Sequence, residues 1–343
     1  CGEAVPAWTV QRNCASAMQA IDSAATNISM GRSDLVLAGG CEAMSHAPVL
    51  FNNQMVNWFG DWQKSRSIMT KLQTLSTLRL SHFSPVIGLL KGLTDPIVNL
   101  SMGQTAEVLA YHFDITREQM DQFSLNSHQR LALAIDNHYL SEIESVISRE
   151  GFVFEQDSGL RRESSLAQLA TLKAVFDKNG LVTAGNSAQI TDGAACLLLA
   201  SEDAVTYYNL PILGQIIDTH WSGLDPAKMG LGPAYAVPPL LQRHQLALHD
   251  IDYWEINEAF ASQVLACLAA WQDDDFCRNE LNLDSAYGAI DPTRLNVDGG
   301  AIALGHPVGA TGARIALHLL QVLKRHNAKM GVATLCIGGG QGG

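Results

Sequence analysis

Four residues of this sequence stand at predicted boundaries of secondary structure and carry side chains that take part in acyl-transfer chemistry. The first, Cys14, precedes a run of small residues that predicts a helix. The N-terminal turn of a helix offers unpaired N–H groups and a positive potential, and both stabilise a thiolate. Because a thiolate is the nucleophile that acyl transfer requires, Cys14 is a candidate nucleophile. The alternative interpretation is a small, buried, apolar side chain.

His306 lies between glycines, in the sequence Gly305-His306-Pro307-Val308-Gly309. Glycine lets the backbone fold tightly around an imidazole, and Pro307 stiffens the turn. An imidazole held in this way would act as the base for a thiol contributed by the other half of the chain. The alternative is a histidine on a surface loop.

Cys336 and Asn257 each follow apolar residues that predict a strand. Cys336 is followed by Ile337 and then by the glycines 338–340, which leave backbone N–H groups accessible to a developing oxyanion. The alternative for Cys336 is a core cysteine before a turn. The amide of Asn257 would either position a water or cap a helix. All four residues fall at strand ends or strand–helix junctions, where the ligands of α/β sheets bind.

Two stretches, one near each end of the chain, follow the same plan and would position these residues. The first predicts a strand at 8–12, a helix from 15 to about 30 and a strand at 35–38 before two glycines; the second predicts a strand at 295–297, a glycine-rich loop at 299–309, a helix from about 310 to 326 and a strand at 332–337. This order is typical of layered α/β folds. The sequence therefore predicts a two-fold duplicated α/β protein.

The residues between these stretches have a different composition. A capping box at 116–119 predicts a helix to about Asn137, residues 166–176 predict another helix, and residues 194–200 predict a buried strand. Residues 46–100, with Trp58 and Trp62, predict an excursion inserted into the first half, and the acidic residues 273–291 predict a second, irregular insertion.

The composition excludes several classes of protein. The chain has 343 residues, 47% of them hydrophobic, which is enough for a substantial core and too many for a disordered protein. A formal net charge of −12 argues against nucleic-acid binding. Seven cysteines with no C-x-x-C pair argue against a disulfide framework and a structural zinc site, and favour a reducing compartment. No apolar run approaches the roughly 20 residues that span a membrane.

Taken together, four segments resemble the thiolase family. They are Asn13-Cys14-Ala15-Ser16-Ala17, Asn257-Glu258-Ala259-Phe260, Gly305-His306-Pro307 and Cys336-Ile337-Gly338-Gly339-Gly340. The resemblance covers nearly the whole chain, and residues 101–107 and 186–193 most resemble the thiolase β-subunit of the fatty-acid oxidation trifunctional complex. It implies an α/β thiolase fold, with two pseudo-symmetric layered halves (α-β-α-β-α) and an inserted loop domain.

The resemblance implies a reaction, the thiolytic cleavage of 3-ketoacyl-CoA by CoA in fatty-acid β-oxidation. Cys14 would attack the ketone while His306 takes the thiol proton, and Cys336 would protonate the acetyl-CoA enolate that leaves. Free CoA would then take the acyl group from Cys14. One oxyanion hole would consist of His306 and a water held by Asn257, and the other of the backbone N–H groups of Cys14 and Gly338.

The resemblance also implies that CoA and acyl-CoA bind as substrates, with no permanently bound cofactor. Arg161 matches a basic residue at the nucleotide end of CoA. Contacts along the pantetheine arm are implied for Met102, Phe176, Ser187, Ala188, Ala259 and Phe260. Two positions near this arm depart from the family pattern: many members have Ala-Ser in place of Ser187-Ala188, and a histidine in place of Ser101.

By the same resemblance we expect four segments along the chain. They are residues 1–43 (opening segment of the first half), 44–190 (inserted loop domain, binding CoA), 191–211 (returning strand of the first half) and 212–343 (second half). The expected partners are further copies of this chain in a homodimer or homotetramer, and a hydratase/dehydrogenase α-subunit. The excursion at 46–100 is a candidate for docking on that subunit or on a membrane surface, or it is an ordinary surface excursion. Bacterial cytoplasm and mitochondrial matrix fit the cysteine content equally.

Other functions remain open at this stage. The close enzymatic alternative is an acetoacetyl-CoA thiolase that condenses two acetyl-CoA molecules, and the alternative from another class is a non-catalytic thiolase-fold protein that binds acyl-CoA or lipid. A ketoacyl synthase is disfavoured, because it would place a second histidine where Asn257 stands. A dinucleotide-binding enzyme is disfavoured because residues 299–312 lack G-x-G-x-x-G spacing.

The chain begins with Cys1 and lacks the opening and closing strands that the family pattern has. We therefore expect a fragment of a longer protein, with exposed sheet edges, poor solubility and no activity if the truncation is real.

Overall fold

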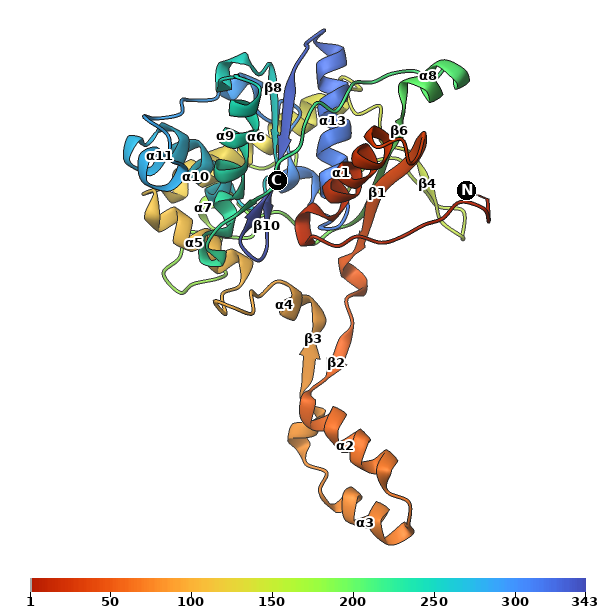
Figure 1. Ribbon diagram of the computed structural model, residues 1–343. Helices are drawn as coiled ribbons and strands as arrows, with labels where there is room; N and C mark the ends of the chain where they lie inside the picture. Colours follow the sequence, from red (N-terminus) through yellow and green to blue (C-terminus); the bar gives the residue numbers. More distant parts are fainter. Residues whose placement is uncertain (1) are drawn as a thin grey trace. The chain divides into compact units, whose positions relative to one another are not determined.

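The computed structural model describes residues 2–343 (Figure 1). These residues divide into two compact units. Unit 1 comprises the described residues up to Ala43 together with Asp95–Gly343, and unit 2 comprises Met44–Thr94.

Unit 1 contains both α-helices and strands. Its α-helices are α1 (Ser16–Ser29), α5 (Met102–His112), α6 (Arg117–Asp136), α7 (Leu166–Ala170), α8 (Glu202–Tyr208), α9 (Gly232–Arg243), α10 (Ala261–Gln272), α11 (Asp274–Leu281), α12 (Ala301–Leu304) and α13 (Thr311–Arg325). Its 3-10 turns are η1 (Asn13–Ala15), η4 (Pro226–Leu231), η5 (Leu248–Asp250) and η6 (Pro292–Arg294). Its strands are β1 (Leu35–Ala43), β4 (Val146–Ile147), β5 (Val153–Phe154), β6 (Asp192–Ala200), β7 (Ser222–Gly223), β8 (Tyr253–Ile256), β9 (Gly331–Thr334), β10 (Cys336–Ile337) and β11 (Gln341–Gly342).

The strands of unit 1 form small sheets, several of which join segments that are distant in the sequence. Strands β1 and β6 pair antiparallel along their whole length, from Leu35 opposite Ala200 to Ala43 opposite Asp192. Strands β8 and β9 pair in parallel. Strands β10, β11 and β7 form an antiparallel sheet, and β4 pairs with β5. Because parallel strands end at the same edge, the residues that follow β8 and β9 are neighbours.

Helix α13 is the central element of unit 1, since it contacts α1 and the strands β1, β6, β8 and β9 (Figure 1). Its buried face carries Ala313, Ile315, Leu319 and Val322. At Gly312 a Cβ atom would lie 2.5 Å from the backbone nitrogen of Met18. Only glycine therefore lets α13 approach α1 this closely.

The largest core cluster surrounds α10, between α5, α9 and β8. Trp254 and Trp271 are both almost fully buried there, with ring centroids 6.1 Å apart, and the indole N–H of Trp271 donates to the carbonyl of Ala234. Helix α10 is apolar on most sides because it is enclosed by other elements.

Unit 2 is a helical hairpin on a short antiparallel stem. Its elements are η2 (Met44–His46), β2 (Val49–Phe51), α2 (Asn53–Lys64), α3 (Ile68–Ser76), η3 (Leu80–Phe83), β3 (Pro85–Ile87) and α4 (Gly88–Gly92). Side chains of Asn52 and Ser67 cap the two long helices. Trp58 stacks on Trp62 with centroids 5.5 Å apart, and its indole N–H donates to the carbonyl of Thr74. The hydrogen bond to Thr74 joins α2 to α3.

Several predicted elements are confirmed, although the strand predicted at 35–38 does not end at the two glycines but continues through them to Ala43, because Gly39 and Gly40 pair with Cys196 and Ala195. Helices occur at α1, α6 and α13, and strands occur at β1, β6 and β8. The predicted strand at 332–337 is divided into β9 and β10 at Leu335, whose N–H and carbonyl pair instead with Gly343. The side chains of β6 alternate between exposed and half-buried, so the prediction that this strand is fully buried was wrong.

Other predicted elements are corrected by the structure. Residues 8–12 are not a strand, and the N–H of Arg12 donates to the hydroxyl of Ser16. Residues 295–297 make one isolated bridge, because Asn296 has a positive φ of 44° and its side-chain amide pairs with the N–H and carbonyl of Ile256. The predicted loop after it includes the short helix α12, and the acidic insertion includes α11.

The helix predicted at 166–176 ends at Ala170. Beyond it, Ala174 pairs with Thr183 in an isolated bridge, and the N–H of Val175 donates to the carbonyl of Val182. Backbone groups of Ala174 and Val175, which a longer helix would need, are therefore paired with the segment at Val182 and Thr183.

Candidate active site

Cys14 lies in the tight turn between the extended residues 8–12 and helix α1. The turn is closed by Ser16, whose hydroxyl accepts from the N–H of Arg12 at 2.9 Å and donates to the carbonyl of Asn13 at 2.8 Å. Asn13 has a positive φ of 44°, a conformation that asparagine adopts more easily than most residues. The sharp turn leaves Cys14 half-buried at the start of the helix.

The thiol of Cys14 is influenced by groups from three parts of the chain. Burial raises its pKa, and the nearby carboxylate of Glu42 acts in the same direction. The backbone N–H groups of Gly338 and of Cys14 itself act in the opposite direction, because both point toward the sulfur. The resting side chain is therefore a thiol, and the two N–H groups stand where negative charge would develop next to it.

Cys336 reaches the same place from the other end of the chain. It is the first residue of β10, which turns through Gly338, Gly339 and Gly340 into β11. The side chain is buried, and burial raises its pKa well above the usual value, with the nearby Cys14 as a second cause. Two uncharged thiols from opposite ends of the chain thus lie close enough to influence each other's ionisation.

His306 is held in one tautomer by Thr311. Its Nδ1 lies 2.7 Å from the hydroxyl oxygen of Thr311, and that hydroxyl donates its single proton to the carbonyl of Pro307 at 3.0 Å. The hydroxyl must therefore accept from the imidazole, so the proton sits on Nδ1 and Nε2 carries a free lone pair. Burial, with the positive Arg314 as a lesser cause, lowers the pKa of His306 to about 3. The imidazole is neutral and able to accept a proton.

The loop that carries His306 is fastened on both sides. The N–H of His306 donates to the hydroxyl of Thr191 at 3.1 Å, and the N–H of Gly309 donates to the carboxylate of Glu42 at 3.0 Å. Since Glu42 also acts on the pKa of Cys14, this carboxylate lies between the histidine loop and the nucleophile turn.

Asn257 follows β8 and lies next to the end of β9, because its N–H donates to the carbonyl of Thr334 at 3.0 Å. Its side chain is buried, yet among the described residues neither its Oδ1 nor its Nδ2 has a hydrogen-bond partner. A buried amide without partners is costly, so the group is suited to hold a water or a substrate oxygen.

The neighbouring residue Glu258 fixes the backbone of this segment. Its buried carboxylate accepts from the hydroxyl of Ser127 at 2.7 Å, from the amide of Asn296 at 2.9 Å and from the N–H of Ile302 at 3.2 Å. Three elements thus converge on Glu258 and hold Asn257 in place.

An apolar wall adjoins the buried face of Cys336. It consists of the half-buried Met102 and Phe176 together with the buried Ala259 and Phe260. The rings of Phe176 and Phe260 meet edge to face with centroids 6.0 Å apart. A Cβ atom at Gly338 would lie 3.3 Å from the sulfur of Met102, so this wall reaches the glycine turn. Four of the predicted pantetheine contacts therefore lie together beside the candidate chemistry.

Ser187 and Ala188 join the same wall from the segment after Leu181. Ser187 forms an isolated bridge with Phe260, and the N–H of Ala188 donates to the carbonyl of Ala259 at 3.0 Å. The hydroxyl of Ser187 donates to the carbonyl of Thr183 at 2.7 Å, so its proton is used within the segment.

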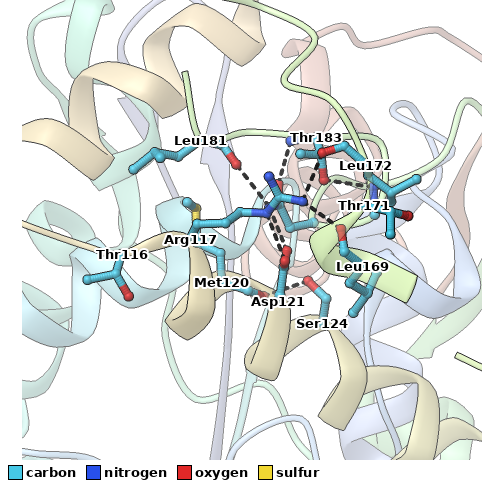
Figure 2. A network of polar contacts seen from close by, with 12 residues as sticks. Thr116, Arg117, Met120, Asp121, Ser124, Leu169, Thr171, Leu172, Leu181 and Thr183 are labelled. Atoms are coloured by element: carbon cyan, nitrogen blue, oxygen red, sulfur yellow. Dashed lines mark hydrogen bonds and ion pairs between the residues drawn. The ribbon is translucent and has the colours of Figure 1, made fainter. Parts of the chain in front are cut away.

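A polar network anchors this segment to α6 (Figure 2). Arg117 pairs with Asp121 at 2.7 Å and donates to the carbonyls of Leu169 and Leu172. Asp121 accepts from the amide of Asn186, which in turn accepts from the N–H of Thr183. The residues just before Ser187 are therefore held against α6.

Arg161 is exposed and lies next to the end of this segment. Its guanidinium donates to the carbonyls of Ser158 and Leu160 and, at 3.4 Å, to the side chain of Gln189. Its backbone N–H donates to Nδ1 of His128 at 3.2 Å. The guanidinium of Arg161 thus faces solvent beside Gln189.

Sequence reasoning missed three residues that the structure places at the site: Asn13, Glu42 and Thr311. Glu42 lies in a segment whose contact with the histidine loop could not be seen from spacing, Thr311 lies five residues after His306 in the same stretch, and Asn13 directly precedes the candidate nucleophile at a predicted junction. A polar residue that tolerates positive φ at such a junction was the available signal.

Within the described residues there is no cluster of three or more histidine, cysteine, aspartate or glutamate side chains that would hold a metal ion. No helix in residues 2–343 is both long and apolar enough to cross a membrane.

Comparison with known proteins gives consistent matches over the whole chain. The model of the thiolase N-terminal domain matches residues 1–203, and that of the thiolase C-terminal domain matches residues 210–343. The chain is 37% identical to a 3-ketoacyl-CoA thiolase of Yersinia pestis over 340 residues, which cover 98% of this chain and 77% of that protein.

Solved structures agree. The crystal structure of human mitochondrial 3-ketoacyl-CoA thiolase matches with a TM-score of 0.82 and 37% identity, covering 99% of this chain and 78% of that one. The same human enzyme in complex with CoA matches with a TM-score of 0.82 and 36% identity, over 99% of this chain and 77% of that one. The acetyl-CoA acetyltransferase of Bacillus anthracis matches with a TM-score of 0.82 and 36% identity, over 99% and 78% of the two chains.

Proposed function

Because the chain belongs to the thiolase family and has the thiolase fold, we propose that it cleaves 3-ketoacyl-CoA by thiolysis, with Cys14 as the nucleophile. The products are acetyl-CoA and an acyl-CoA shortened by two carbons, as in fatty-acid β-oxidation. The observation that carries the assignment of residues is the packing of the Cys14 turn η1 against β10, which begins at Cys336, because this brings the two cysteines together from opposite ends of the chain.

In the first half-reaction the sulfur of Cys14 bonds to the ketone carbon, and the thiol proton passes to Nε2 of His306. The bond between C2 and C3 then breaks, the carbonyl reforms as an acyl thioester on Cys14, and the electron pair stays on acetyl-CoA as an enolate. Cys336 donates its proton to C2 and becomes a thiolate. The enolate carbon needs a proton donor close by, and the buried neutral thiol of Cys336 is such a donor.

In the second half-reaction the thiol of CoA attacks the acyl thioester. Its proton restores Cys336, the acyl group moves to the sulfur of CoA, and the sulfur of Cys14 leaves and takes back the proton held by His306. The protons balance over the cycle. The three side chains return to their starting states, and only the two substrates are consumed.

Negative charge develops on oxygen in both halves. The backbone N–H groups of Cys14 and Gly338, which point toward the sulfur, are suited to one oxyanion. His306 together with a water on the unpartnered amide of Asn257 is suited to the other. The resting side chains of Cys14 and His306 are both neutral. Negative charge therefore forms only during the attack, when the substrate oxygen can carry part of it.

We also propose how CoA binds. The wall of Met102, Phe176, Ala259 and Phe260, with Ser187 and Ala188 at its edge, takes the pantetheine arm, since these residues lie together beside Cys336. Arg161 takes the nucleotide end, where its exposed guanidinium pairs with phosphate. We also keep a proposal for how the chain is divided. The first half consists of residues 1–43 and 191–211, the inserted domain of residues 44–190, and the second half of residues 212–343.

We propose a homodimer or homotetramer in the bacterial cytoplasm or the mitochondrial matrix, with a hydratase/dehydrogenase α-subunit as a partner that docks on unit 2. Support for docking is the exposed apolar surface of unit 2, where Ile68, Met69 and Leu80 are 81%, 68% and 91% exposed. Light scattering of the chain alone and with such an α-subunit tests both statements. A chain that stays monomeric and unchanged by the subunit would contradict them.

The decisive experiment is peptide mapping by mass spectrometry after incubation with acetyl-CoA. An acetyl group on Cys14, absent from Cys14→Ala, establishes the acyl-enzyme. A folded protein that binds acetyl-CoA without an adduct would instead be a non-catalytic binder. Because the chemistry is reversible, parallel assays of thiolysis and of acetoacetyl-CoA formation then decide between cleavage and the condensing alternative.

A further inference from the structure

Asn13 touches the glycine turn that carries one of the proposed oxyanion donors. Its side-chain Nδ2 donates to the carbonyl of Gly338 at 2.7 Å, across a sequence separation of 325 residues. On its other side, the N–H of Gly338 points toward the sulfur of Cys14. The residue that supplies the N–H is therefore held by the residue that immediately precedes the nucleophile.

The glycine turn needs such a contact from outside. Strands β10 and β11 are two residues long each, and they are joined by Gly338, Gly339 and Gly340, of which the last two have φ of 94° and 74°. Glycine has the greatest conformational freedom of all residues, and so short a hairpin has few hydrogen bonds of its own to restrict it. The direction of the N–H at residue 338 must be set by neighbouring groups.

A second contact comes from the adjacent residue. The guanidinium of Arg12 donates to the side chain of Gln341 at 3.1 Å, and it lies 4.2 Å from the centroid of the ring of Trp221. Trp221 in turn donates to Asp22 on helix α1 at 3.2 Å. The two residues before Cys14 thus hold the hairpin at its tip and at the start of β11.

The conformation of Asn13 aligns this contact. With φ of 44° the residue lies in the left-handed region, which glycine, asparagine and aspartate enter most readily. Of these three, only asparagine has a side chain with an N–H that can donate to a carbonyl. The position thus combines a backbone requirement with a donor requirement.

We propose that Asn13 is a positioning residue, whose side-chain amide sets the N–H of Gly338 against the sulfur of Cys14. This inference rests on the proposed role of Cys14 and adds a residue to it. Asn13 itself touches neither the reacting atoms nor CoA in this scheme. It acts through the peptide groups of residue 338, and displacements of about 1 Å in such groups cost on the order of 100-fold in rate.

The test separates the amide from the backbone conformation. Asn13→Gly keeps the left-handed turn and removes the amide, while Asn13→Asp keeps the turn and the size and replaces the donor with a group that repels the carbonyl of Gly338. We expect both variants to lower kcat for thiolysis about 10- to 100-fold, with KM for CoA within about twofold. Asn282→Gly, the same exchange at the left-handed cap of α11, is the control and should keep the kcat of the parent.

A second readout does not depend on turnover. The N–H of Gly338 favours the thiolate of Cys14, so its displacement should move the pH midpoint of Cys14 alkylation by iodoacetamide upward in both Asn13 variants. Unchanged kcat and midpoint in Asn13→Gly would overturn the proposal. So would a loss of kcat that matches a loss of folded protein, with an unchanged midpoint.

Failure of the proposed function would look different. If acetyl-CoA leaves no adduct on Cys14 of the parent chain, thiolysis through Cys14 is wrong, whatever the variants do. The alkylation midpoint still decides whether Asn13 sets the Gly338 N–H against the sulfur, because that measurement needs only a folded chain and a reactive thiol.

Discussion

Replacement of Thr311 by valine removes one hydroxyl from a buried position without changing the shape of the side chain. In the parent chain this hydroxyl accepts from Nδ1 of His306 at 2.7 Å and donates to the carbonyl of Pro307 at 3.0 Å. The carbonyl of Pro307 also accepts from the N–H groups of Ala310 and Thr311, so it keeps partners in the variant. The loss therefore falls on the imidazole alone.

An imidazole that keeps its proton on Nδ1 would face a methyl group in Thr311→Val. A buried donor without a partner costs about 1–3 kcal/mol, and the ring avoids this cost by moving the proton to Nε2. Nε2 is then no longer a base. To react, the variant must return to the less stable tautomer, which predicts a fall in kcat of about 5- to 150-fold, since about 1.4 kcal/mol corresponds to tenfold.

The assay is steady-state thiolysis, together with the rate at which acetyl-CoA acetylates Cys14. Both rates should fall by the same factor, while KM for CoA changes little because Thr311 is not part of the proposed CoA wall. Thr311→Ser keeps the hydroxyl and should retain kcat within a few fold. A valine variant with the kcat of the parent would refute the reasoning about the tautomer.

Three further predictions follow from the pKa shifts and the glycine turn. Alkylation of Cys14 in the free enzyme should have a pH midpoint above that of an ordinary thiol, because burial raises its pKa; a midpoint near neutrality, measured by mass spectrometry, would contradict this. For His318, burial opposes protonation but hydrogen bonds with Asp298 and Glu142 prevail and raise the pKa to about 10. Its stabilising contribution is complete below the unfolded pKa of about 6.5 and is lost as the pH rises through about 10. The difference in free energy of unfolding between the parent and His318→Gln, measured by urea denaturation, should therefore shrink over that pH range. A difference that stays constant would contradict this prediction. Gly340→Ala places a Cβ 2.2 Å from the carbonyl oxygen of Leu224 at a positive φ, and should lower Tm by several degrees and kcat at least about tenfold; an unchanged Tm would show that the turn adapts.

Much of the fold was predictable from local pattern. The small residues of α1 and α13, the capping box before α6 and the apolar run of β8 each carry their own signal, and the structure confirms them. Local pattern failed where distant groups compete for the backbone. The side-chain amide of Asn296 makes the hydrogen bonds to Ile256 that a neighbouring strand would make. The helix predicted after Leu166 ends early because the N–H of Val175 donates to the carbonyl of Val182.

The candidate site divides in the same way. Cys14, His306, Asn257 and Cys336 could be chosen from the sequence, because each has reactive chemistry at a predicted junction. Thr311, Glu42 and Asn13 act by holding other groups. The need for Glu42 and Asn13 depends on which distant segments meet in space, whereas Thr311 is five residues from His306 and its role depends on how that loop folds. No spacing in the sequence reveals that Asn13 and Gly338 are in contact, because 325 residues separate them.

The stem of unit 2 has an evolutionary consequence. Strands β2 and β3 pair side by side, and the N–H of Gly88 donates to the carbonyl of Pro48, so the excursion leaves and returns at neighbouring points. Each doubling of the length between such points costs only about 0.6 kcal/mol in chain entropy. Insertions, deletions and new binding surfaces can therefore accumulate in unit 2 at little cost to the rest of the chain. The residues proposed for catalysis all lie in unit 1, so a change of length in unit 2 removes none of them.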